Sequence, residues 1–317
     1  MTRFAGRVTT LMVLLGAALV APGAAHATPE ADAARADIQK TFGFVPGFMK
    51  LTPDLALPGA WAEMKSLHLN PNTAVPGKMK DLIGLAVAAQ IPCEYCIYAH
   101  TEFAKLNGAT DAEISEAVAM GALTRKWSTW LNGVQTDEGK YRSEIAQLVA
   151  NMKKMMAAGG PPPSKPAPVM DGMGALKQVE QSFGMTPEFL RRYPQEGLAG
   201  AWTEMRDLEM NPSTAIPGKY KSLIGLAVAA QIPCRFCVIG DTEFAKLEGA
   251  TDREIGEAVA MAGMVRHWST IANGRQVDKA AFKKEVNRIV AGARKHMAAA
   301  AAPAAKPAAA PTMTAVK

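Results

Sequence analysis

Two cysteines three residues apart, with a histidine four residues further on, form the most reactive group in this 317-residue chain. Cys93, Cys96 and His100 lie in the run PCEYCIYAH. Because each residue of an α-helix turns by about 100°, these positions fall within roughly 60° of one another on one helix face. A base beside a dithiol is the arrangement that activates a sulfur nucleophile. The spacing therefore indicates thiol or disulfide chemistry.

The cysteine pair recurs 141 residues later without its histidine. Cys234 and Cys237 repeat the spacing, but Asp241 stands at the histidine position. A carboxylate near a thiol raises the thiol pKa through like-charge repulsion. We therefore expect the second pair to be inactive or a passive structural disulfide.

A carboxylate on the preceding predicted helix completes the first site. We expect His100 to take the proton of Cys96, and Asp81 to orient His100 directly or through a water. Cys93 is expected in the first turn of its helix, as the more exposed partner, where the helix dipole lowers a thiol pKa. The other interpretation of Asp81 is a solvated charge near a helix start.

The cysteine motifs belong to two copies of a longer unit. The run IGLAVAAQIPC occupies residues 83–93 and again 224–234, and the register is constant from 38 to 137 and from 179 to 278. A period this long indicates two tandem domains. Apolar residues at three- and four-residue spacing predict helices, with no convincing strand. The fold class is therefore all-α, two tandem bundles of about six helices related by pseudo-two-fold symmetry.

The helices expected in the first unit are followed by equivalent ones in the second. The helices expected in the first unit span residues 57–69, 78–90, 92–106, 111–130 and 138–156. The second of these is apolar on all sides, so we expect it to be buried against its counterpart in the other unit.

Residues 1–27 have the features of a secretory signal. Arg3 and Arg7 precede an apolar run, and an Ala-His-Ala sequence ending at Ala27 fits a cleavage site. The run is too short for a comfortable membrane span, although an uncleaved anchor is the alternative. We expect cleavage after Ala27, a periplasmic or secreted protein, and no membrane insertion afterwards. In an oxidising compartment, two local cysteine pairs favour redox function over stapling.

Composition divides the chain into five segments. Runs rich in Pro, Gly and Ala separate the repeats and follow the second one. The predicted division is a signal peptide (1–27), repeat 1 (28–156), a linker (157–170), repeat 2 (171–297) and a disordered Ala/Pro/Lys tail (298–317).

The charges are scattered over the sequence. The net charge is +6, and removal of the signal arginines leaves +4. Basic residues alternate with acidic ones and form no aromatic-interleaved stripe, so we expect no nucleic-acid partner. His68 is replaced by Glu209 in the second copy, which favours a surface position tolerant of charge.

The segment from Asp81 to Gly108 closely resembles the alkylhydroperoxidase AhpD core of the carboxymuconolactone decarboxylase-like superfamily. The shared motif is an acid, eleven residues, C-x-x-C, three residues and a histidine, and the similarity covers both repeats. The resemblance implies an all-helical fold, obligate oligomers, and hydroperoxide reduction or dithiol–disulfide exchange.

Carried over by position, the resemblance implies a role for each residue of the first site. Cys96 corresponds to the attacking thiol, Cys93 to its disulfide-forming partner and His100 to the proton-relay histidine. Asp81 stands where the family usually has Glu, one methylene longer. In the second repeat Ser222 replaces the acid, so that half lacks both relay members.

We therefore expect an exported, peroxiredoxin-type antioxidant enzyme that needs no metal or organic cofactor. Its substrate would be a hydroperoxide or disulfide, its reductant an external dithiol, and its assembly a homo-oligomer. Three alternatives stay open. The chain could be a non-catalytic helical scaffold with structural disulfides, a structural zinc could join the four thiolates, or the chain could be a lactone-acid decarboxylase, as the superfamily name suggests.

Overall fold

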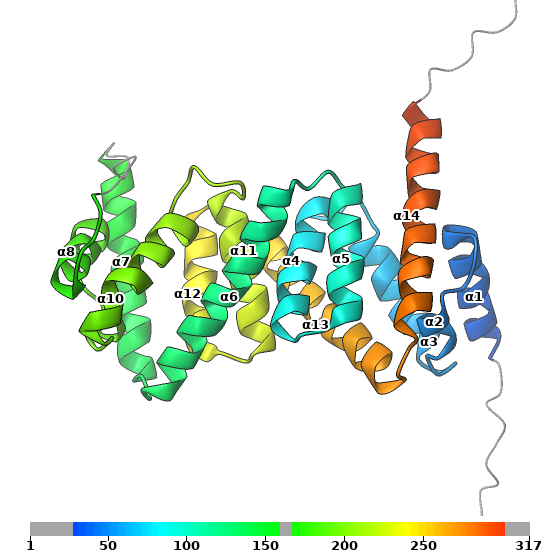
Figure 1. Ribbon diagram of the computed structural model, residues 1–317, viewed down its shortest axis with the longest axis horizontal. Helices are drawn as coiled ribbons and strands as arrows, with labels where there is room; N and C mark the ends of the chain where they lie inside the picture. Colours follow the sequence, from blue (N-terminus) through cyan, green and yellow to red (C-terminus); the bar gives the residue numbers. More distant parts are fainter. Residues whose placement is uncertain (1–27, 159–166, 302–317) are drawn as a thin grey trace, which may run out of the picture.

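The computed structural model describes residues 28–158 and 167–301 (Figure 1). The predicted signal peptide, most of the linker and most of the tail lie outside the described residues. Within them every regular element is a helix, and the same series occurs twice, so the prediction of two tandem all-α bundles is confirmed. No helix in this part of the chain is long and apolar enough to cross a membrane.

Each repeat consists of seven α-helices and one π-helical turn. Repeat 1 comprises α1 (Pro29–Phe42), α2 (Gly47–Lys50), α3 (Leu57–Glu63), the π-turn η1 (Met64–His68), α4 (Gly77–Gln90), α5 (Glu94–Leu106), α6 (Asp111–Gly133) and α7 (Glu138–Ala157). Repeat 2 comprises α8 (Gly172–Phe183), α9 (Glu188–Arg191), α10 (Gln195–Glu204), the π-turn η2 (Met205–Glu209), α11 (Gly218–Gln231), α12 (Arg235–Leu247), α13 (Asp252–Gly274) and α14 (Lys279–Ala301).

Several helix boundaries differ from the sequence predictions, and two of the differences affect the interpretation. The cysteine helix begins at Glu94, with Cys93 as its N-cap in an extended conformation, so Pro92 precedes the helix and Cys93 is outside its first turn. Helix α14 continues to Ala301, beyond the predicted start of the tail at residue 298. Alanine has the highest helix propensity of all residues, which explains why the Ala-rich run extends the helix.

The apolar helices α4 and α11 form the centre of the molecule and pack against each other. Leu82, Ile83 and Ala86 of α4 have no exposed surface. Small residues let neighbouring backbones approach: a Cβ added to Gly121 of α6 would lie 3.1 Å from the Ala86 carbonyl oxygen. The expectation that α4 is buried against its counterpart is therefore confirmed.

The last helix of each repeat packs on the cysteine helix of the other repeat. Helix α14 contacts α5 and α7 contacts α12, so the two long helices stand toward opposite ends of the molecule (Figure 1). Tyr95 Oη on α5 donates a hydrogen bond of 2.6 Å to the Val277 carbonyl oxygen, and its ring meets Phe282 edge to face. Each dithiol site is therefore enclosed by helices of both repeats.

Two equivalent glutamates, one in each repeat, add further contacts between the repeats. The Glu257 carboxylate of α13 accepts hydrogen bonds of 2.9 and 2.7 Å from the backbone N–H groups of Ala74 and Val75, in the loop before α4. Glu116 of α6 does the same for residues 215 and 216 before α11. Because each loop is held by the other repeat, we expect the two repeats to unfold together.

Glu257→Ala tests this coupling. The substitution leaves two inward-facing amide groups without an acceptor, so we expect the free energy of unfolding to fall by about 2 kcal/mol. Urea unfolding followed by circular dichroism measures it. Glu257→Gln, which keeps one acceptor oxygen, should lose less, and Glu180→Gln on the exposed face of α8 should lose nothing. A Glu257→Ala variant as stable as the parent would contradict the coupling.

Candidate active site

Helices α4 and α5 pack side by side and bring Asp81 and His100 together. Asp81 lies on the second turn of α4, and only 1% of its surface is exposed. His100 lies on α5 and is 8% exposed. The interpretation of Asp81 as a solvated charge is therefore wrong.

Each C-x-x-C pair forms a disulfide at the start of its helix. Cys93 is bonded to Cys96 and Cys234 to Cys237. The Cys93 Sγ atom also accepts a hydrogen bond of 3.3 Å from the Cys96 backbone N–H. Cys93 has no exposed surface and Cys96 keeps 7%, so the expectation that Cys93 is the more exposed partner is wrong. As an N-cap residue, Cys93 turns its side chain back over the helix start, where the other repeat covers it.

The Asp81 carboxylate is the centre of a buried hydrogen-bond cluster. Its Oδ1 atom lies 3.2 Å from His100 Nδ1 and 2.7 Å from His68 Nε2, and its Oδ2 atom accepts a hydrogen bond of 2.8 Å from Asn107 Nδ2. Burial disfavours the ionised carboxylate, but the charge and hydrogen bonds of the two imidazoles outweigh it and lower the pKa of Asp81 to about 2. Asp81 is therefore an anion that two histidines share.

His100 is held between this carboxylate and the backbone of α4. A Cβ at Gly84 would lie 2.5 Å from His100 Cε1, so only glycine leaves room for the ring. Burial lowers the pKa of His100, and the hydrogen bond to Asp81 offsets this only in part. The imidazole is therefore neutral at neutral pH. Because its Nδ1–H donates to Asp81, the Nε2 atom keeps a lone pair that can accept a proton.

The direct contact expected between His100 and Cys96 is not formed. Within residues 28–158 and 167–301, no hydrogen bond joins His100 to either sulfur, and the Cys96 Sγ atom lies 4.0 Å from the Val265 carbonyl oxygen of α13. A disulfide sulfur carries no proton to donate, so the oxidised pair offers His100 nothing to accept. Proton transfer to His100 therefore requires the reduced dithiol, with a side-chain adjustment or a bridging water.

His68 belongs to the site, and the expectation of a surface position is wrong. The His68 side chain is 8% exposed, and the centroid of its ring lies 5.3 Å from the centroid of the His100 ring. The π-turn Met64–His68, a feature often found at functional sites, delivers it there. One feature of the sequence could have identified His68 as a site residue: four positions differ together between the two repeats. His68, Asp81, His100 and Asn107 are replaced together by Glu209, Ser222, Asp241 and Glu248.

The equivalent position in repeat 2 is acidic. Burial raises the pKa of Glu209 to about 7. Burial and the nearby Glu209 raise the pKa of Asp241 well above its usual range, and its Oδ2 atom has no hydrogen-bond partner among the described residues. The helix that carries Cys237 therefore holds, at Asp241, a carboxyl group that tends to stay protonated in place of the imidazole of the first site.

His68, Asp81 and His100 each place one donor atom within 4.8 Å of the others. Two imidazoles and one carboxylate are ligands that zinc or iron(II) accepts. In this structure the Asp81 Oδ1 atom lies within hydrogen-bond distance of a nitrogen of each imidazole.

Comparisons with known proteins point to one family. The model of the carboxymuconolactone decarboxylase family matches residues 56–136 and 196–280, one region in each repeat and together more than half of the chain. No curated protein matches. A crystal structure provisionally assigned as a gamma-carboxymuconolactone decarboxylase subunit from Burkholderia xenovorans LB400 is 18% identical, with a TM-score of 0.47. The similarity covers 86% of this chain and 98% of that one.

The acidic site of repeat 2 predicts a pH-dependent stability. Between the ordinary Glu pKa of 4.5 and about 7, the folded state binds more protons than the unfolded state. The free energy of unfolding should therefore fall as the pH rises through this window. Glu209→Gln and Asp241→Asn remove the titrating groups and should flatten the slope in urea unfolding at pH 5 and pH 8. Exposed Glu180→Gln should keep it, and equal slopes in all variants would contradict the assignment.

Proposed function

This chain belongs to the carboxymuconolactone decarboxylase family, and from that premise we propose that it is an exported thiol-dependent oxidoreductase, acting through the Cys93–Cys96 pair. Its reaction is hydroperoxide reduction or dithiol–disulfide exchange. The observation that carries the proposal is the buried Asp81–His100 pair, whose histidine lies one turn after Cys96 on α5. Repeat 2 keeps its disulfide but lacks that pair.

Each residue has a part in the proposed peroxide reaction. In the reduced protein, His100 takes the Cys96 proton and the thiolate attacks the terminal peroxide oxygen, giving a sulfenic acid. The proton returns to the leaving alkoxide as an alcohol. The Cys93 thiolate then attacks the Cys96 sulfur, water leaves and the disulfide forms. An external dithiol restores both thiols. One peroxide and one dithiol thus give one alcohol, one water and one disulfide.

The Asp81 anion supports His100 in this cycle. Its hydrogen bond fixes the imidazole with Nδ1 protonated and Nε2 free, and its negative charge stabilises the imidazolium that forms when the Cys96 proton is taken. His68 and Asn107 occupy two further acceptor sites of the carboxylate and keep it in place.

Cys96→Ser and Cys237→Ser form a matched pair for the central test. A serine hydroxyl does not ionise near neutral pH, so Cys96→Ser should lose essentially all reduction of cumene hydroperoxide by dihydrolipoamide. Cys237→Ser should keep the parental rate, because repeat 2 lacks the relay. Undiminished turnover by Cys96→Ser would rule out the proposal.

The same variants separate the alternatives. Turnover of a lactone acid that survives loss of both cysteine pairs would identify a decarboxylase. Pairs that stay oxidised in redox buffers below about −300 mV would indicate a scaffold with structural disulfides.

Gly84→Ala and Gly225→Ala test the position of His100. The new methyl group at residue 84 would lie 2.5–2.7 Å from three His100 ring atoms and should push the imidazole off Asp81. We expect turnover to fall at least tenfold, with an altered pH–rate profile. Gly225→Ala places a methyl group 2.9 Å from the Asp241 carboxyl group and should leave turnover unchanged. Equal losses in two folded variants would contradict the role of His100.

A further inference from the structure

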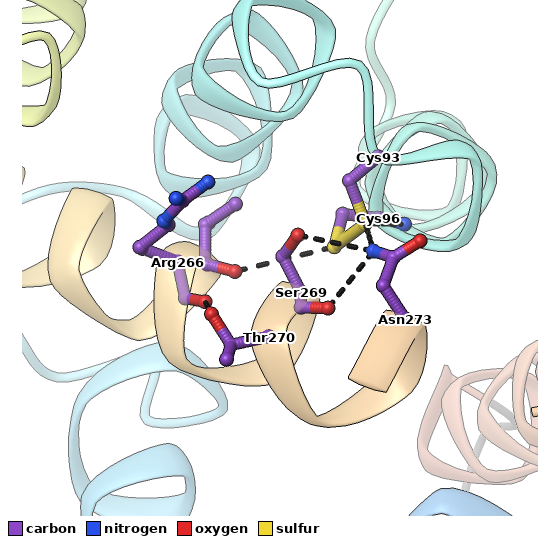
Figure 2. The surroundings of a disulfide bond; sticks show 7 residues. Cys93, Cys96, Arg266, Ser269, Thr270 and Asn273 are labelled. Atoms are coloured by element: carbon purple, nitrogen blue, oxygen red, sulfur yellow. Dashed lines mark hydrogen bonds between the residues drawn. A yellow bond between two sulfur atoms is a disulfide. The ribbon is translucent and has the colours of Figure 1, made fainter. Parts of the chain in front are cut away.

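Repeat 2 contributes a side chain to the dithiol of repeat 1. Asn273, near the end of α13, points its amide nitrogen at the Cys93 sulfur, 3.6 Å away (Figure 2). We propose that Asn273 is the hydrogen-bond donor that stabilises the Cys93 thiolate and so sets the reactivity and redox potential of the Cys93–Cys96 pair. This inference rests on the proposed thiol function and deepens it, because it makes the site a product of both repeats.

The Asn273 amide is fixed in orientation by its own helix. Its Nδ2 atom donates to the Ser269 carbonyl oxygen at 2.9 Å and lies 3.3 Å from Ser269 Oγ (Figure 2). Three acceptors around one nitrogen require the amide N–H groups, and not the amide oxygen, to face the sulfur. The donor is therefore already in place before the sulfur acquires charge.

The Cys93 sulfur is well placed to gain from such a donor when it becomes an anion. It has no exposed surface, so water cannot solvate it, and it also accepts the Cys96 backbone N–H at the start of α5. Hydrogen bonds to a charged acceptor are stronger than those to a neutral one, and donors that favour the ionised form lower its pKa. Both donors therefore stabilise the reduced, thiolate state more than the disulfide.

Exposure assigns the two sulfurs different parts in reduction by a dithiol. Cys96 keeps 7% of its surface and Cys93 keeps none, so Cys96 is the sulfur that we assign to attack by an incoming thiolate. Attack at the Cys96 sulfur forms a mixed disulfide, breaks the Cys93–Cys96 bond and releases Cys93 as a thiolate. The second thiol of the reductant then gives its proton to His100 and displaces Cys96, which takes that proton from His100, while Cys93 remains a thiolate. A leaving thiolate of lower pKa leaves faster, so Asn273 accelerates the first displacement, in which Cys93 is released.

The structure contains a matched contact in the other half. Asn132 of α6 lies 3.6 Å from Cys234 Sγ and is held by Ser128 as Asn273 is held by Ser269. The two contacts are reciprocal, as expected for halves related by an approximate two-fold axis. Asn132 thus offers the same substitution at the same position of the fold, directed at the pair without a relay.

The experiment uses the full chain with Cys234→Ser and Cys237→Ser, so that only the first pair titrates. Thiolate absorbance at 240 nm against pH gives the thiol pKa values, and equilibration in dithiothreitol buffers gives the potential. Asn273→Ala should move the lower thiol titration to higher pH. It should also make the disulfide about tenfold harder to reduce, a shift of roughly 30 mV to more negative potential. Asn132→Ala should change neither quantity.

Parental titration and potential in a folded Asn273→Ala variant would overturn the inference, as would an equal shift in Asn132→Ala. If Asn273→Ala does not fold, Asn273→Asp replaces the donor by a carboxylate of the same size. It should shift both quantities further in the same direction. An Asn273→Asp variant with the parental titration and potential would overturn the inference. Neither measurement needs a peroxide, so loss of the proposed enzymatic activity would leave this result standing.

Discussion

A carboxylate with almost no exposed surface must find every hydrogen bond inside the protein, and Asp81 imposes this constraint on repeat 1. Water is replaced by two imidazoles and an amide, which come from the π-turn, from α5 and from the end of α5. Burying a charge costs far more than burying a neutral group unless such partners are present. The position of His100 therefore follows from the need to satisfy Asp81 as much as from any catalytic role.

Repeat 2 shows what the same backbone does without that anion. Ser222 replaces Asp81, and the two positions that held imidazoles in repeat 1 hold the acids Glu209 and Asp241. Burial favours the neutral form of these acids, as it does at Asp81, but here no imidazole offsets it and the nearby Lys221 charge offsets it only in part at Glu209. Equivalent helices thus carry an ionised carboxylate in one half and carboxyl groups with raised pKa values in the other. Four side chains, and not the fold, set this difference.

The fold itself could largely be predicted from the sequence, because its signals are local. Apolar periodicity and the repeated IGLAVAAQIPC run fix the type and approximate limits of the helices. The site could be predicted only in part. Asp81 and His100 lie on consecutive helices, and the spacing of these residues along the sequence suggests that the two helices are in contact. His68 was missed, because its side chain reaches Asp81 through a π-turn whose extra residue per turn the apolar pattern does not reveal.

The sequence did not predict the contacts between the side chains of one repeat and the cysteines of the other. The prediction that Cys93 is the exposed sulfur treated α5 as an isolated helix, whereas α13 of the other repeat covers its start and supplies Asn273. In a symmetric dimer of single units, a change at one site appears at both. Fusion removes that restriction: Asp241 can replace a histidine in one half while Asn273, in that same half, still contacts the dithiol of the other. The repeat that lacks an Asp–His pair of its own therefore still contributes a side chain to the dithiol site of the other repeat.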